Sequence, residues 1–110
     1  MSDKIYISDE IVVPQAQLAQ VRDAYHREYV PAARARGMTL EGAWRSPPID
    51  LPDRTTTLHF LWSVPDAGAW WQMRLDGVEQ KARWWAEVDA MIASRKRTVM
   101  VKAGEDGADV

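Results

Sequence analysis

Proton transfer near neutral pH is the chemistry for which this 110-residue sequence has its best candidates, because it contains two histidines and three tyrosines. His59 is the strongest candidate. It lies in an alternating run, residues 55–64, in which one face carries Leu58, Phe60, Trp62 and Val64. The opposite face carries Thr57, His59, Leu61 and Ser63. We expect His59 to line a half-polar cavity and to act as an acid or base on a bound ketone, phenol or lactone. The alternative is an inert, hydrogen-bonded histidine in a mixed cavity or a dimer contact.

Further candidates lie on two other predicted elements. Residues 4–13 alternate as a strand, and Tyr6, Ser8 and Glu10 would share the face of His59. In an apolar cavity Glu10 would hold its proton more tightly and could act as an acid or base, whereas at the rim it would form a salt link. On the predicted helix of residues 14–36, one side carries Arg22, Tyr25, His26 and Tyr29. That group could bind a carboxylate or enolate, or could be a solvated helix edge over two core tyrosines.

Six tryptophans with a single phenylalanine indicate a wide, partly polar interior or interface, although most of them are expected in the core or a dimer contact. Trp70, Trp71, Trp84 and Trp85 form two adjacent pairs, and helical neighbours diverge by ~100°, so one of each pair could line a cavity.

From all these candidates, we predict His59, Tyr6 and His26 as catalytic residues. The predicted substrate-binding residues are Arg22, Tyr25, Tyr29, Trp44, Leu61, Trp71 and Trp85. Arg45 could clamp an anion or form a surface salt bridge, and because Trp44 and Arg45 alternate, only one of them should enter a given pocket.

Composition excludes several classes of function. The sequence has no cysteine, which rules out thiolate catalysis and cysteine-ligated metals. A net charge of −2 argues against nucleic-acid binding. A zinc site from His26, His59 and a carboxylate has no supporting ligand spacing, and nucleotide-binding and serine-hydrolase motifs are missing. We expect no cofactor, no metal, no membrane association and a cytoplasmic location.

The predicted elements are a strand, a helix, two strands, a helix in two pieces and a last strand at residues 96–102. Asp9 interrupts the apolar face of the first strand, which predicts a bend or bulge there, or two short strands in place of one. Pro31 should kink or split the first helix near Tyr29 and Val30. Residues 38–46 read as one alternating strand, followed by a stiff proline-rich loop at residues 47–53 that could cover a pocket. Asp76, Gly77 and Glu79 predict a break between two helices.

This order, βαββαβ, is that of ferredoxin-like folds: an α+β domain with a four-stranded antiparallel sheet. Helices on one face would leave the other face bare, and pairing two sheets across a two-fold axis would cover it. We expect one domain over residues 1–102 and a disordered acidic tail at residues 103–110.

The chain resembles the dimeric α/β-barrel superfamily, which includes NIPSNAP-like and EthD-like proteins, muconolactone isomerases, antibiotic-synthesis monooxygenases and polyketide cyclases. The resemblance is carried by the element order and by the runs at residues 4–8, 37–40 and 58–62, and the residues 69–71 are most similar to the NIPSNAP-like branch. It implies a homodimer whose cavity holds an apolar, ring-containing molecule without a metal.

Three functions are compatible with these features. The first is a cofactor-independent isomerase, cyclase or lyase that moves protons on an apolar aromatic or polycyclic molecule. The second is a small monooxygenase, cofactor-free or haem-using. The third is a non-catalytic binding or interaction module. An enclosed cavity at His59 would favour the first two, and a flat apolar surface would favour the third.

Overall fold

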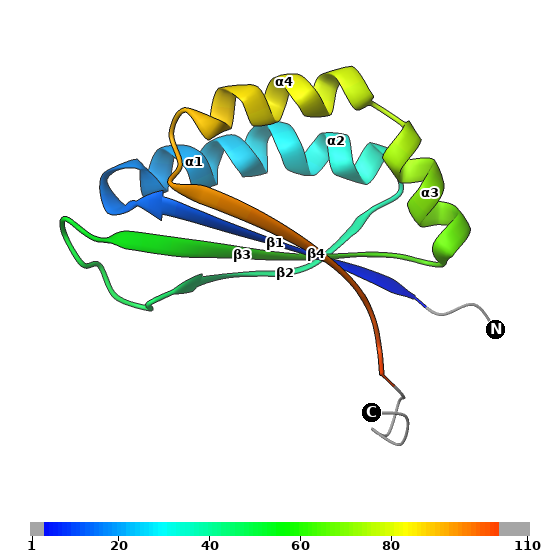
Figure 1. Cartoon of the computed structure of the whole chain (residues 1–110), viewed down its shortest axis with the longest axis horizontal. Helices are drawn as coiled ribbons and strands as arrows, with labels where there is room; N and C mark the ends of the chain where they lie inside the picture. The colour runs from blue at the N-terminus through cyan, green and yellow to red at the C-terminus, as the bar shows by residue number, and fades with distance from the viewer. Residues whose placement is uncertain (1–3, 104–110) are drawn as a thin grey trace.

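The computed structural model describes residues 4–103, which form a four-stranded antiparallel sheet with helices on one face only (Figure 1). The strand order in the sheet is β2-β3-β1-β4. In chain order the elements are β1 (Ile5–Pro14), η1 (Gln15–Gln17), α1 (Leu18–Ala24), η2 (Tyr25–Tyr29), α2 (Val30–Ala35), β2 (Thr39–Ser46), β3 (Thr55–Val64), α3 (Ala67–Leu75), α4 (Val78–Asp89) and β4 (Ser94–Val101). The predicted α+β ferredoxin-like fold is confirmed. Apart from its first residue, the predicted tail lies outside the described residues.

The two central strands, β1 and β3, have the two-faced pattern that their alternation predicts. Ile7 and Ile11 of β1 and Phe60 and Trp62 of β3 are buried on the face that the helices cover. His59 lies on the other face, directly opposite Glu10 of β1. The bulge predicted at Asp9, and its alternative of two short strands, were wrong, because β1 pairs without interruption from Ile5 to Pro14.

A β-bulge in β2 overturns the predicted alternation of residues 38–46. The pairing with β3 shifts between Leu40 and Gly42, so that one extra residue, Glu41, is inserted. As a result Leu40 lies opposite Trp62 on the helix-covered face, while Trp44 lies opposite His59 on the bare face. The bulge therefore brings Trp44 beside the histidine.

The segment predicted as one helix over residues 14–36 is divided where Pro31 requires it. A turn of π-helix, η2, ends at Tyr29, and α2 begins at Val30. Proline has no N–H to donate to the preceding turn and its ring crowds that turn, so the wider turn relieves both problems. The predicted split near Tyr29 and Val30 is confirmed, and both tyrosines of the turn are buried.

The second helical region also breaks where the sequence predicts. Asp66 caps α3 by accepting a hydrogen bond from the Ala69 backbone N–H at 2.8 Å. Gly77 separates α3 from α4 in a left-handed conformation, with φ of 62°. Asp76 instead accepts a hydrogen bond from Gln72, so the break forms without the capping box that its spacing suggested.

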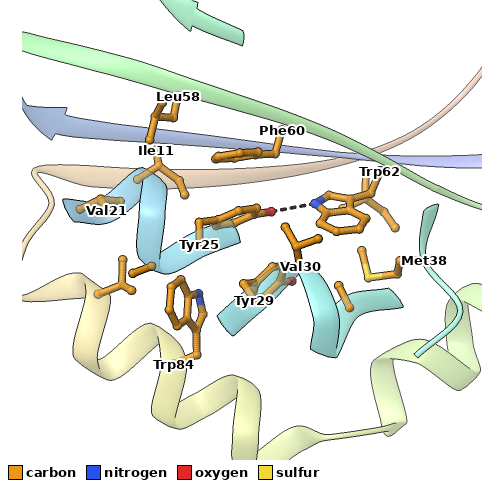
Figure 2. Packing of buried hydrophobic residues seen from close by; sticks show 14 of the residues in the cluster. Ile11, Val21, Tyr25, Tyr29, Val30, Met38, Leu58, Phe60, Trp62 and Trp84 are labelled. Carbon is orange, nitrogen blue, oxygen red and sulfur yellow. Dashed lines mark hydrogen bonds between the residues drawn. The ribbon is translucent and has the colours of Figure 1, made fainter. Parts of the chain in front are cut away.

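Aromatic side chains fill the layer between the sheet and the helices, as Figure 2 shows. Tyr25 stacks on Phe60 with ring centroids 3.7 Å apart, and the rings of Tyr29 and Trp84 pack next to it. Burying a side chain of this size contributes about 2–3 kcal/mol through the hydrophobic effect. Within residues 4–103, no helix combines the length and the apolar character needed to cross a membrane.

Candidate functional site

A groove of about 410 Å³ lies on the bare face of the sheet, beside His59. We call it the open-face groove; its lining residues are Ser8, Trp44, Arg45, Ser46, His59, Phe60 and Leu61. They come from β1, β2 and β3, and the face has no helix over it (Figure 1). Its lining of aromatic and aliphatic carbon with a few hydroxyls and one imidazole suits a flat, mostly apolar ligand.

Both ring nitrogens of His59 face polar side chains on neighbouring strands. Its Nε2 lies 2.9 Å from the hydroxyl oxygen of Ser46 on β2. Its Nδ1 lies 3.7 Å from a carboxylate oxygen of Glu10 on β1. A carboxylate on the Nδ1 side favours the tautomer that carries its proton there, which leaves the Nε2 lone pair to accept from Ser46. In that tautomer Nε2 can act as a base.

Trp44 forms an aromatic wall of the groove, and Gly42 allows its position. The indole of Trp44 folds back over Gly42, where an added Cβ would lie only 2.4 Å from a ring carbon. Trp44 is 57% exposed, so a large apolar ring faces solvent in this chain. Only glycine at position 42 leaves room for that ring position.

Arg45 also borders the groove, although its pairing with Leu58 sets it on the face opposite to Trp44, as the alternation predicts. The Arg45 guanidinium donates to Asp50 at 2.7 Å and to the backbone carbonyl of Pro48 at 3.0 Å. It thereby ties the proline-rich loop to the rim of the groove.

The structure places two other candidates of the bare face at different distances from His59. Leu61 lines the groove. Tyr6 pairs with Ser63, while Glu10 pairs with His59, so Tyr6 lies four residues, or about 13 Å, along β1 from the histidine. The Tyr6 ring lies between the Lys4 and Lys102 ammonium groups instead, at 5.8 and 6.0 Å.

Tyr25 and Tyr29 belong to a polar network on the opposite, helix-covered face. The Arg97 guanidinium donates two hydrogen bonds to Asp9, at 2.6 and 2.8 Å, and one to the Tyr29 hydroxyl. Tyr25 donates to Asp9 at 3.1 Å and accepts from the Trp62 indole at 2.7 Å, the contact drawn in Figure 2. Each member of this network has a partner, so it stabilises the interior without leaving a buried charge unpaired.

Burial governs the ionisation of this network. It raises the pKa of Tyr25 well above its ordinary value, and the Asp9 carboxylate adds to that rise. Burial alone would lower the pKa of Arg97, but the hydrogen bonds and charge of Asp9 outweigh it and the pKa is raised. Tyr25 stays protonated and Arg97 charged at neutral pH, so neither is suited to exchange protons there.

The remaining candidates lie away from the groove. Arg22 is exposed and pairs with Asp23 at 3.2 Å. His26 is exposed on η2, edge-on to Tyr25, whereas His59 lies on the other side of the sheet, so the two histidines cannot share a metal ion. The exposed Trp71 lies on α3. Trp85 borders a separate hollow of about 90 Å³ next to Asp9, Arg95 and Arg97.

The sequence interpretation missed Ser46 and the Asp9–Arg97 pair. Ser46 precedes a proline loop and carries no motif, and its approach to His59 depends on the bulge in β2. Asp9 and Arg97 are 88 residues apart. The only available signal for this pair was an acidic residue on the apolar face of one predicted strand and an arginine at the matching position of another.

The fold and groove define the class of this molecule: a single-sheet, ferredoxin-like α+β domain with a ligand-sized groove on its bare face. No family model matches the sequence, and no curated protein matches it.

Solved structures do match. The chain is similar to a NIPSNAP family protein of unknown function from Agrobacterium tumefaciens, with a TM-score of 0.69, 9% identity, and 92% of this chain and 89% of that chain covered. It is similar to an uncharacterized NIPSNAP domain protein from Burkholderia xenovorans, with a TM-score of 0.62, 12% identity, and 92% and 96% covered.

A further match is a variant of SnoaB, a cofactor-independent oxygenase from Streptomyces nogalater, with a TM-score of 0.60, 14% identity, and 94% of this chain and 96% of that chain covered. At such low identity the likeness concerns the fold. The expected likeness to NIPSNAP proteins and to small monooxygenases is confirmed as a likeness in fold.

Proposed function

We propose that this protein is a cofactor-independent enzyme that moves protons on an apolar, ring-containing small molecule bound in the open-face groove. The observation that carries the proposal is the position of His59, which borders an apolar hollow of about 410 Å³ while its two ring nitrogens face Ser46 and Glu10. An imidazole with polar partners at both ring nitrogens, beside a ligand site, is suited to general acid–base catalysis. Isomerase, cyclase and lyase reactions of ketones or phenols all need such a step.

The groove supplies the binding contacts for such a ligand. The flat Trp44 ring and the Leu61 side chain offer apolar surface, and the hydroxyl of Ser8 offers a hydrogen bond. An aromatic ligand stacked on Trp44 would lie over β2 and β3, with its polar edge toward His59.

The proposed enzyme is a homodimer in which a second copy covers the bare face. Support comes from the exposure of that face: Trp44 is 57% exposed and Met100 of β4 is 37% exposed, both beyond what the helices cover. A second sheet over this face would convert the open groove into an enclosed cavity and exclude water from His59. Light scattering should give twice the 12.5 kDa chain mass, and a monomer would refute the dimer.

Hydrogen–deuterium exchange of 2-tetralone tests the proton transfer directly. This bicyclic ketone has acidic C–H groups next to its carbonyl, and a base in the groove should catalyse their exchange in D₂O, followed by NMR. We expect His59→Ala to reduce the catalysed rate by at least about 100-fold. The matched control is His26→Ala, which removes the exposed histidine of η2 and should keep the wild-type rate. An equal rate in wild type and His59→Ala would refute the proposal.

A second candidate, a cofactor-independent monooxygenase, is favoured by the fold likeness to SnoaB. In that case the groove would hold an electron-rich hydroquinone, and His59 would take its phenolic proton before reaction with oxygen. Oxygen consumption with such a substrate, absent in His59→Ala, would select this function over isomerisation. If the protein catalyses neither the 2-tetralone exchange nor oxygen uptake, both enzyme functions are refuted and the non-catalytic binding module is the remaining candidate.

A further inference from the structure

We propose that Ser46 is a nucleophile for acyl transfer, activated by His59 and oriented through Glu10, and that the groove accepts esters or lactones of apolar, ring-containing acids. This inference rests on the proposed binding of ring-containing molecules in the open-face groove and on His59 as the base. It adds a covalent step at a side chain on β2.

Three adjacent strands bring a hydroxyl, an imidazole and a carboxylate together on one face of the sheet. Ser46 of β2 lies 2.9 Å from His59 Nε2, and Glu10 of β1 lies 3.7 Å from His59 Nδ1. His59 of β3 lies between them because β3 pairs with both neighbours. This is the order in which a serine nucleophile, its base and the orienting acid act in acyl-transfer enzymes.

The hydrogen-bond directions suit activation of the serine. The Glu10 carboxylate, 3.7 Å away, favours the tautomer with the proton on Nδ1, and in that tautomer the Nε2 lone pair can accept the Ser46 hydroxyl proton. A serine hydroxyl is a weak nucleophile until a base takes its proton as it attacks. Ser46 is exposed, so a substrate carbonyl can approach it from the groove.

The surroundings of Ser46 match an ester with a ring-containing acyl group. Trp44, two residues earlier on the same face, provides the flat apolar surface, and the groove borders Ser46 itself. Thr57 is the cross-strand partner of Ser46, so its hydroxyl projects on the same face and can donate to the negative charge that develops on the carbonyl oxygen.

The reaction balances with water as the only co-reactant. The Ser46 oxygen bonds to the carbonyl carbon while its proton moves to His59 Nε2. The carbon–oxygen bond to the alcohol then breaks, and the alcohol leaves with that proton. Water attacks the acyl-serine, gives one proton to His59, and the carboxylic acid leaves as Ser46 regains its hydrogen.

An aryl fluorophosphonate tests the nucleophile without knowledge of the natural ester. Its phosphorus bonds to an activated serine oxygen, and fluoride leaves with the hydroxyl proton. We expect one label per chain, mapped by peptide mass spectrometry to Ser46, and none at that peptide in Ser46→Ala. Ser94→Ala removes an exposed serine at the far edge of the sheet and should label like wild type. No label, or a label at another residue, would overturn the proposal.

Two further variants test the roles of the partners. His59→Ala should slow labelling by at least about 100-fold, and His59→Gln, which keeps hydrogen-bonding capacity, provides a second variant if the first fails to fold. Glu10→Gln should slow labelling by about fivefold, because a partly exposed carboxylate contributes little to stabilising the imidazolium that forms as His59 takes the Ser46 proton. The ¹⁵N shifts of the His59 ring should show the Nδ1–H tautomer in wild type and a mixture in Glu10→Gln. Wild-type labelling in His59→Ala would refute activation by the imidazole.

The exchange experiment separates the two proposals. If the wild-type protein catalyses 2-tetralone exchange but Ser46 takes no label, the nucleophile fails and the acid–base function stands. If exchange also fails, the proposed function fails with it.

Discussion

The two faces of the sheet use similar residue types for different purposes. The helix-covered face holds Tyr25, Trp62 and the Asp9–Arg97 pair, which are linked in a chain of hydrogen bonds, and the hollow beside the ion pair measures about 90 Å³. The bare face holds Trp44 and His59 beside a groove of about 410 Å³. Aromatic and titratable side chains thus serve stability where they pack together and remain available for a ligand where they do not.

Truncating a tryptophan on each face should give the largest contrast. Trp62→Ala removes a fully buried ring and the hydrogen bond to Tyr25, so we expect a loss of about 3–5 kcal/mol in the free energy of unfolding. Trp44→Ala removes a ring that is 57% exposed and should cost less than about 1 kcal/mol. Urea denaturation measures both variants. Equal losses in the free energy of unfolding would contradict the claim that tryptophans on the two faces have different roles.

Breaking the interior ion pair should have the next largest effect. Asp9→Asn leaves the Arg97 guanidinium without its counter-charge, and we expect a loss of about 2 kcal/mol because the Arg97 side chain is 30% exposed. The exposed pair of Asp89 and Arg95 is the control, since Asp89→Asn should change stability by less than about 0.5 kcal/mol. A larger loss in the control would contradict the assignment of the network to the interior.

The buried Tyr25 predicts a fall in stability at alkaline pH. Because the pKa of Tyr25 is raised, the folded chain keeps this phenol proton after the unfolded chain has lost it. Stability is fully present below about pH 10 and falls above it, by up to about 1.4 kcal/mol per pH unit from this group. In Tyr25→Phe the fall should be shallower in urea titrations between about pH 9 and about pH 11. An unchanged slope would show that Tyr25 ionises freely.

Gly42→Ala should have a small effect on stability and a larger one on ligand binding. The new Cβ would meet the Trp44 ring, which can swing toward solvent, so the cost should stay below about 1 kcal/mol. Displacing the ring removes its stacking surface, and affinity for an aromatic ligand should fall by about tenfold, or about 1.4 kcal/mol. Unchanged affinity in a fluorescence titration would mean that Trp44 is not part of the binding surface.

Local pattern was enough to predict most of the fold. The alternation from Leu58 to Val64 assigned both faces of β3, and Pro31 marked the helix division, because each depends on neighbours in sequence. The bulge at Glu41 was missed because it depends on pairing with β3, which no local pattern records.

The candidate site was less predictable for the same reason. His59 was assigned to the bare face from its own strand, but Ser46 became its neighbour only through the register of β2. Tyr25 was predicted to bind substrate from helical spacing alone, and its position between Asp9 and Trp62 depends on residues far along the chain. Spacing along one element could not distinguish the interior from a groove.

The six tryptophans provide the most direct test of the claim that ligands bind on the bare face. Indole N–H signals in a ¹H–¹⁵N spectrum would be followed while 2-naphthol, a small apolar phenol, is added. We predict that the Trp44 signal shifts first and most, while those of Trp62 on the covered face and Trp71 on α3 stay in place. A shift of Trp71 or Trp85 with Trp44 unchanged would contradict the account.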